Sequence, residues 1–100
     1  MNTLNSNQRK ILTQAAQTVK PVVQIGQNGL TESVMAKIEQ SLNAHELIKV
    51  KFLEFKEEKV EISEEIASST NSALVRIIGN VAIFYKPAEK EEKQKYGILL

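Results

Sequence analysis

The sequence contains no cysteine, no tryptophan and no aspartate, and it has a single histidine, His45. A disulfide-stabilised scaffold and a zinc site built from Cys and His side chains are therefore excluded. A Ser-His-Asp triad cannot be assembled, and a two-metal site would need Glu side chains alone. We therefore expect a protein that is not an enzyme and that uses no metal, no cofactor and no small-molecule substrate.

Long hydrophobic runs are also missing. The longest, Val81 to Tyr85, is far too short to cross a bilayer, and the polar residues 1–7 contain no apolar segment of a signal peptide. We therefore expect a cytoplasmic protein with no membrane partner. The chain has 100 residues, of which 42% are hydrophobic, and this suits one compact, monomeric domain with no second domain.

The sequence has almost no excess charge of either sign, because it contains 13 basic and 12 acidic residues and its net charge is only +1. This average is low for a nucleic-acid-binding protein. The distribution is uneven, because residues 1–51 contain six basic side chains and three Glu, whereas residues 52–88 contain four basic side chains and six Glu. Positive charge is thus concentrated in the first half of the chain.

The first half of the chain shows first a helical and then an extended pattern. Ser6 is expected to cap a helix with one apolar face, and Pro21 ends it. The β-branched run of residues 22–25 predicts a buried strand, and residues 26–29, with a glycine at each end, predict a turn. Thr31 is expected to cap a second helix.

The middle of the chain predicts a strand over residues 47–52 and a charged helix over residues 57–70. In the strand, alternation places one apolar set toward the core, and the other set is expected on a solvated, basic face: Leu47, Lys49 and Lys51. The helix has a narrow apolar stripe, formed by Val60, Ile62, Ile66 and Ala67.

The last elements are two apolar segments, residues 74–78 and 81–86, joined by Gly79-Asn80, which predict a β-hairpin. The complete order is α-β-α-β-α-β-β. It predicts an α/β (α+β) domain over residues 1–88, with three helices and a mixed four-stranded sheet that ends in an antiparallel pair. Residues 89–100 form a charged tail that we expect to be mobile.

Gly26, Gln27, Asn28 and Gly29 form a GxxG motif between the first predicted strand and the second helix. Two glycines three apart occur often by chance, but this position permits a tight loop whose backbone N–H groups point outward at a helix N-terminus. Such a loop can hold phosphate, as in KH domains, because a nucleic-acid backbone can come close and the helix dipole favours negative charge. The alternative is that the glycines only form a tight turn.

Several basic side chains are candidates for contacts with nucleic-acid phosphates: Arg9, Lys10, Lys20, Lys49 and Lys51. Any one of them is more often part of a solvated surface. Several of them close to one phosphate-binding loop favour a nucleic-acid interface.

Two aromatic residues and the histidine have other candidate roles. Phe84 and Tyr85 point to opposite faces of the last predicted strand, so at most one is expected in the core, and the other could stack on a base. Packing is the better interpretation of both. His45 is expected to interact with carbonyl groups at the end of the second helix rather than to act in catalysis.

Three linked segments carry a resemblance to a known family. They are residues 20–31, which read KPVVQIGQNGLT, residues 45–51, which read HELIKVK, and Ile78-Gly79 followed by Tyr85-Lys86-Pro87. In this order and spacing they resemble the bacterial YhbY family of stand-alone CRM-domain RNA-binding proteins. The resemblance implies a fold similar to the C-terminal domain of translation initiation factor three, with an added helix. It also implies association with precursors of the large ribosomal subunit and kinship with plant organelle splicing factors.

The sequence departs from the family pattern at a few positions. Members of the family often have a basic residue within the GxxG motif or after the Ile-Gly pair, where this chain has Gln27, Asn28 and Asn80. Ala16-Gln17 stands where they have Ala-His. These differences leave the fold unaffected but indicate RNA contact that is weaker, or more dependent on RNA shape, than in more basic members.

The loop and the resemblance together predict an RNA-binding protein that associates with ribosomal RNA of large-subunit precursors and assists ribosome assembly. One alternative is a protein-interaction module, recruited to the assembling ribosome through the acidic third helix or the tail. Another is a small phosphate-ester enzyme that uses the loop as an anion cradle. The missing Asp, Cys and second His disfavour this enzyme.

Overall fold

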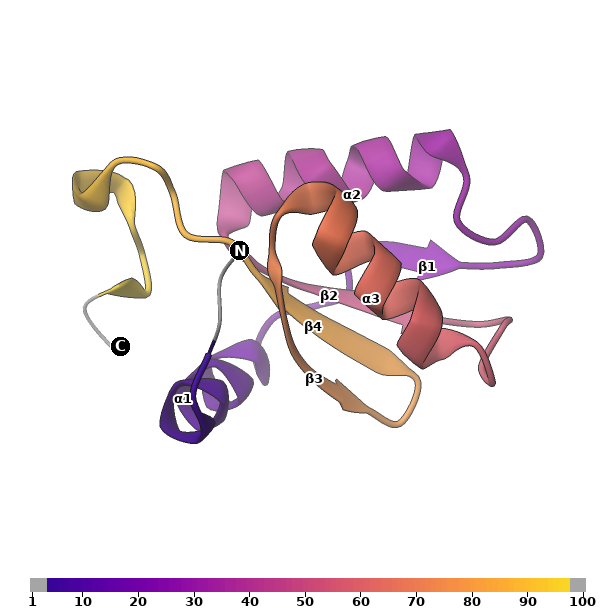
Figure 1. Ribbon diagram of the computed structural model, residues 1–100, viewed down its shortest axis with the longest axis horizontal. Helices are drawn as coiled ribbons and strands as arrows, with labels where there is room; N and C mark the ends of the chain where they lie inside the picture. The colour runs from indigo at the N-terminus through magenta and orange to yellow at the C-terminus, as the bar shows by residue number, and fades with distance from the viewer. Residues whose placement is uncertain (1–3, 98–100) are drawn as a thin grey trace.

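The computed structural model describes residues 4–97, which form one α+β domain. Its elements are α1 (Ser6–Ala16), β1 (Val23–Ile25), α2 (Glu32–His45), β2 (Leu47–Phe52), α3 (Lys59–Thr70), β3 (Ala73–Ile78), β4 (Val81–Tyr85) and a short 3-10 helix, η1 (Glu91–Lys93). Figure 1 shows α1 and α2 on opposite sides of the sheet. The predicted order of elements and the predicted fold class are confirmed.

The strands lie in the order β1-β2-β4-β3. β1 and β2 are parallel, because the connection between them crosses the sheet through α2. β4 pairs antiparallel with β2 on one side and with β3 on the other. The predicted mixed sheet is therefore confirmed, and its two edges are β1 and β3.

Two of the helices begin with a side-chain N-cap close to the predicted residues. α1 has Asn5 rather than Ser6 as its N-cap, since the side chains of Asn5 and Gln8 each accept a hydrogen bond from the other's backbone N–H. Thr31 caps α2 as predicted. α3 begins at Lys59, slightly later than predicted, and has no side-chain cap.

Each face of the sheet has its own hydrophobic core. The larger core lies under α2 and α3 and consists of Val23, Ile25, Ile38, Leu42, Ile48, Val50, Phe52, Ile66, Ala67, Ala82 and Phe84. The smaller core lies under α1 and consists of Leu4, Leu12, Ala16, Leu47, Ala73, Val75, Ile83 and Tyr85. The domain therefore has three layers, with the sheet in the middle.

Three predictions about single side chains are wrong. Leu47 is only 1% exposed and lies under α1, although a solvated position was predicted. Phe84 and Tyr85 are both buried, at 0% and 3% exposed, so the preferred interpretation of packing is confirmed for both, whereas the expectation that at most one lies in the core is wrong. Val60 is 51% exposed and lies outside the apolar stripe of α3. The first two errors share a cause, because the packing of α1 on the second face cannot be read from the alternation of a strand.

None of the helices in residues 4–97 has both the length and the apolar composition that a membrane span requires.

Glu46 connects the domain to the segment after β4. It follows α2 with φ 66° and is only 3% exposed. Its carboxylate accepts hydrogen bonds from the backbone N–H groups of Ala88, at 2.7 Å, and of Lys95. This part of the charged tail thus has defined contacts with the domain. The mobility of the tail stays a prediction, and residues 98–100 of its apolar end lie outside the described residues.

Tyr85 shares the environment of Glu46. Its ring meets that of Tyr96 edge to face, with centroids 6.3 Å apart. Burial, and then the charge of Glu46, raise the pKa of Tyr85 above its ordinary value of 10.0. A raised pKa favours the neutral phenol in the folded state. Its contribution to stability is therefore present below a pH of about 10 and is lost as the pH rises through the raised pKa.

Replacing Glu46 with Gln is expected to loosen the segment after β4. A side-chain amide has one acceptor oxygen where the carboxylate has two, so the N–H group of either Ala88 or Lys95 loses its partner. The expected cost is about 1–3 kcal/mol of unfolding free energy. Amide hydrogen exchange at these two residues should accelerate, whereas a Tyr96→Phe control should leave it unchanged. Unchanged exchange in Glu46→Gln would show that the carboxylate does not hold the segment.

Candidate nucleic-acid interface

The GxxG motif forms a closed turn between β1 and α2. The Gly29 N–H donates to the Gly26 carbonyl oxygen at 3.0 Å, and the Thr31 N–H donates to the Gly29 carbonyl oxygen at 3.2 Å. The Gly29 amide is thus bonded within the turn. Gln27 and Asn28 are exposed at the tip, and they are the part of the loop that a ligand can reach.

The two glycines meet different requirements. Gly29 has φ +67°, and a Cβ there would lie 3.4 Å from Cε2 of Phe55, so both the backbone and the aromatic neighbour favour glycine. A Cβ on Gly26 would have no other atom within 4 Å. The tight-turn interpretation therefore accounts for Gly29. Gly26 borders open space, which a ligand backbone can enter.

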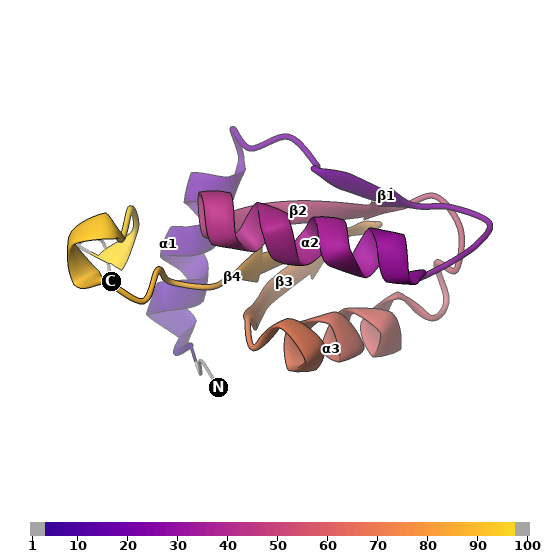
Figure 2. The same cartoon turned by 90° about the horizontal axis from the view of Figure 1, so that it is seen from above.

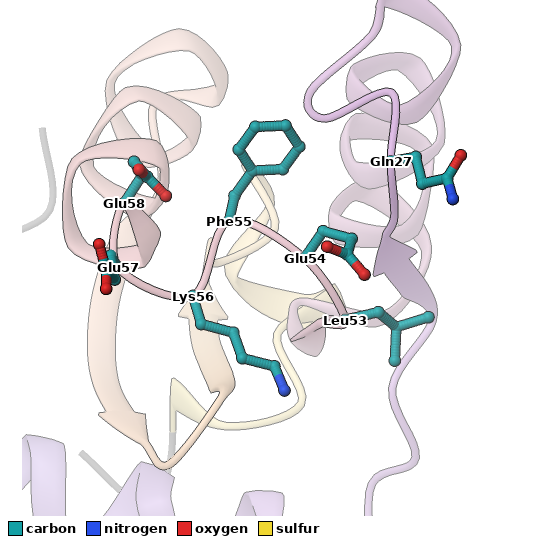
Figure 3. A pocket seen from close by; sticks show the side chains of 7 residues that line it. All are labelled: Gln27, Leu53, Glu54, Phe55, Lys56, Glu57 and Glu58. Carbon is teal, nitrogen blue, oxygen red and sulfur yellow. The ribbon is translucent and has the colours of Figure 1, made fainter.

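A depression of about 520 Å³ lies beside the turn and is lined by residues 53–58 together with Gln27 (Figure 3). Within it, Phe55 is 41% exposed, has φ 57°, and lies between the start of α3 and the GxxG turn. The backbone N–H groups of Leu53 and Glu54 donate to the Ile25 carbonyl oxygen, which fixes this segment at the end of β1.

The side chains of this depression give it negative charge. Glu54, Glu57 and Glu58 line it with only one cation, Lys56. Phosphate groups are repelled by such a group of carboxylates. We therefore name residues 53–58 the acidic flank of the turn, and a nucleic-acid backbone is disfavoured on this side.

Lys49 and Lys51 lie on the other flank, on the face of β2 that points toward the layer of α1. Lys51 pairs in register with Gln24 of β1, and Lys49 pairs with Ile83 of β4. Lys51 and Gln24 are exposed, and Lys49 is partly exposed. Because Gln24 shortly precedes Gly26, the structure brings Lys51 close to the GxxG turn, as the sequence predicts.

Arg9 and Lys10 have different surroundings, although they are neighbours in α1. Arg9 Nη1 donates to the carbonyl oxygens of Leu74 and Val75, each at 2.8 Å, so one nitrogen of its guanidinium group is held by β3. Lys10 is exposed. Lys10 is thus more accessible to a ligand than Arg9, and phosphate contact by Arg9 stays a prediction.

Lys20 is exposed in the segment before β1, at the opposite end of this strand from the GxxG turn. It lines a depression of about 260 Å³ together with His45, Lys95 and Tyr96. His45 is exposed as the last residue of α2, and its predicted interaction with the helix end stays a prediction.

The basic side chains predicted to contact phosphate do not include Arg76, which is exposed in β3. Strict alternation would place Arg76 on the same face as Leu74, toward α3. The register instead pairs Arg76 with Ile83, which belongs to the core under α1. An irregularity in β3 causes this change of face, and no feature of the sequence indicated it.

Residues 4–97 contain no group of three or more His or Glu side chains placed to bind a metal ion. The described surface offers exposed amide side chains, ammonium groups and a helix N-terminus. These groups suit binding of a polyanion through hydrogen bonds and charge.

Known proteins resemble this chain over most of its length. A protein of Haemophilus influenzae, named RNA-binding protein, is 43% identical over 94% of this chain and 96% of its own length. The Pseudomonas aeruginosa protein PA4753, named a probable RNA-binding protein, is 37% identical over 95% of this chain and 92% of its own. The solution structure of the hypothetical protein SAV1595 from Staphylococcus aureus has a TM-score of 0.78 and 30% identity, covering 93% of this chain and 98% of that chain.

The sequence model of the CRS1/YhbY (CRM) domain matches residues 4–86. This range includes α1, the GxxG turn and all four strands. The match and the relatives together show that the chain belongs to the CRS1/YhbY (CRM) domain family.

Proposed function

We propose that this chain binds RNA through the exposed tip of the GxxG turn together with Lys51 and Lys49. The observation that carries the proposal is the position of the turn: Gln27 and Asn28 are exposed just before α2, and Lys51 lies on the neighbouring strand. A helix N-terminus attracts phosphate, and nearby ammonium groups strengthen this attraction. The names of the relatives support the same partner.

The charges around the turn favour one path for the RNA backbone as it leaves the turn. On the acidic flank, three carboxylates repel a phosphate backbone. On the other flank, Lys51 and then Lys49 continue along β2 away from the turn. An RNA backbone held at the tip is therefore expected to leave the turn over the sheet, where attraction continues, rather than over α3.

The resemblance to the YhbY family supports a more specific role. In this proposal the RNA is ribosomal RNA of a large-subunit precursor, and the protein acts as a cytoplasmic monomer that assists assembly without catalysing a reaction. The alternative is recruitment to the same particle through protein contacts. The exposed acidic residues of α3, Glu61, Glu64 and Glu65, are the surface that favours this alternative.

Charge changes at Asn28 test the turn without straining it. Asn28 is exposed, whereas Gly29 has positive φ and lies against Phe55, so substitutions of Gly29 would also disturb the fold. If the turn holds phosphate, Asn28→Asp should weaken binding to a labelled oligouridine at least tenfold, or about 1.4 kcal/mol, and Asn28→Lys should strengthen it. Fluorescence anisotropy measures both affinities.

The two Asn28 variants control each other, because each changes one exposed side chain by one charge. Their thermal midpoints should stay within a few degrees of the parent. Should both variants bind oligouridine as the parent does, the GxxG motif is only a turn, and the RNA site lies elsewhere.

The salt dependence of binding tests the electrostatic part of the proposal. Lys10, Lys20, Lys49 and Lys51 are at least partly exposed, and each phosphate neutralised on single-stranded RNA contributes about 0.7 to the slope of log K against log salt concentration. We therefore expect a slope of about −3. A slope close to zero would contradict binding through phosphates.

The proposed role in assembly predicts a location in cell extracts. In a density gradient the protein should run with free large subunits or their precursors rather than with polysomes. Treatment with RNase should release it from the particle. Equal abundance on polysomes would contradict the assembly role, and retention after RNase treatment would favour the protein-contact alternative.

A further inference from the structure

Strand β3 contains a bulge in the middle of its pairing with β4. Leu74 pairs with Phe84 and Arg76 pairs with Ile83, so two residues of β3, Val75 and Arg76, stand opposite one residue of β4. An extra residue of this kind changes the direction in which the following side chains point.

The burial of the residues around the bulge shows toward which face of the sheet each side chain points. Leu74 and Ile77 both pack against the core under α2 and α3, although they are three residues apart. Val75 lies in the core under α1. Arg76 pairs with Ile83, another residue of that core, and is exposed. Val75 and Arg76 therefore both belong to the face of α1, and the bulge is the reason that Arg76 does not face α3.

Arg9 holds the bulge. Its Nη1 donates to the carbonyl oxygens of Leu74 and Val75, the two residues at which the regular pairing is interrupted, and both distances are 2.8 Å. Charge-assisted hydrogen bonds of this length are among the stronger ones in proteins. Because β3 is an edge strand, no further strand satisfies these carbonyl groups. Arg9 thus connects α1 to the irregular part of β3.

Arg76 shares the face of α1 with the cations of β2. Ile83 pairs with Arg76 on one side and with Lys49 on the other, so the three residues form one row across the sheet. Two strand spacings, about 10 Å, separate the backbones of Arg76 and Lys49, and about 7 Å separates Lys49 from Lys51 along β2. Long basic side chains at these distances can contact one nucleic-acid backbone.

The same face contains little that could stack on bases. The aromatic residues of the strands, Phe52, Phe84 and Tyr85, are all buried. Around Arg76, the exposed positions of this face are Ile78, at 54%, Lys51 and Gln24. A basic face of this composition suits phosphate contacts rather than stacking on base planes.

We propose that Arg76 contacts the RNA backbone on this open part of the sheet, and that Arg9 is a positioning residue that holds the bulge and so turns Arg76 toward the RNA. The inference rests on the proposed function and adds a second contact region beyond the GxxG turn. The ligand of this region is the phosphate backbone, so its contribution to affinity does not depend on base sequence.

Arg76→Gln tests the contact. Arg76 is exposed, so the variant keeps the fold of the parent. Its affinity for oligouridine should fall at least threefold, and the slope of log K against log salt concentration should become shallower by about 0.7. Oligoadenine should lose the same factor. The control is Lys37→Gln, which removes an exposed cation from α2 on the other side of the sheet and should leave the salt slope unchanged.

Arg9→Met tests the positioning role in a double-mutant cycle with Arg76→Gln. If Arg9 acts through Arg76, Arg9→Met weakens binding in the parent and has little further effect in the Arg76→Gln background. Equal effects in both backgrounds would overturn the positioning role. A merely structural role of Arg9 lowers the thermal midpoint but does not make its effect on RNA affinity depend on Arg76.

The result for Arg76→Gln stands on its own if Arg9→Met proves too unstable to study. Affinity and salt slope equal to those of the parent would overturn the inference. A loss of binding in Asn28→Asp would then still support the GxxG contact. If neither Arg76→Gln nor Asn28→Asp changes binding, the proposed function itself fails.

Discussion

Helix α1 covers only part of one face of the sheet, and the proposed RNA contacts on this face, Lys49, Lys51 and Arg76, depend on where this coverage ends. Under α1, Leu47, Ile83 and Tyr85 are buried in the second core. Beyond it, Lys51 is exposed on the same face of β2 as the buried Leu47. One strand therefore contributes to the core and to the surface on a single face. Figure 2 shows the consequence at the scale of the domain, with α1 and the C-terminal segment at one end and the GxxG turn at the other.

The arrangement of charge explains how a chain with a net charge of +1 can hold a polyanion. The potential near a site depends on the charges within about one Debye length, roughly 10 Å at ordinary salt concentration, and not on the total. Around the GxxG turn, opposite charges lie on opposite flanks. Lys51 lies on one flank, and Glu54, Glu57 and Glu58 lie on the other. The carboxylates restrict the direction of approach and so contribute to the orientation of the RNA.

Features with local causes could be predicted from the sequence, and features that depend on distant packing could not. The strand at residues 47–52 and the cap at Thr31 follow from alternation and from side-chain chemistry, and both were predicted correctly. The burial of Leu47 and Tyr85 depends on α1, which is far away in the sequence. The bulge in β3 is held by Arg9, 66 residues before Val75. The GxxG motif was identified, but only the structure shows that the Gly29 amide is used within the turn.

The sequence indicated only one of the two arginines as a phosphate contact, whereas the structure gives the two arginines different surroundings. Arg9 was a candidate for phosphate contact, and Nη1 of its partly buried guanidinium group donates to two carbonyl oxygens of β3. Arg76 was not a candidate, yet it is exposed in one row with Ile83 and Lys49. Gln27 and Asn28 carry no charge, so the tip of the turn supplies no cation of its own. If the open sheet face supplies positive charge instead, the RNA must reach the turn and the sheet together. The shape of the RNA backbone, rather than its base sequence, would then select the ligand.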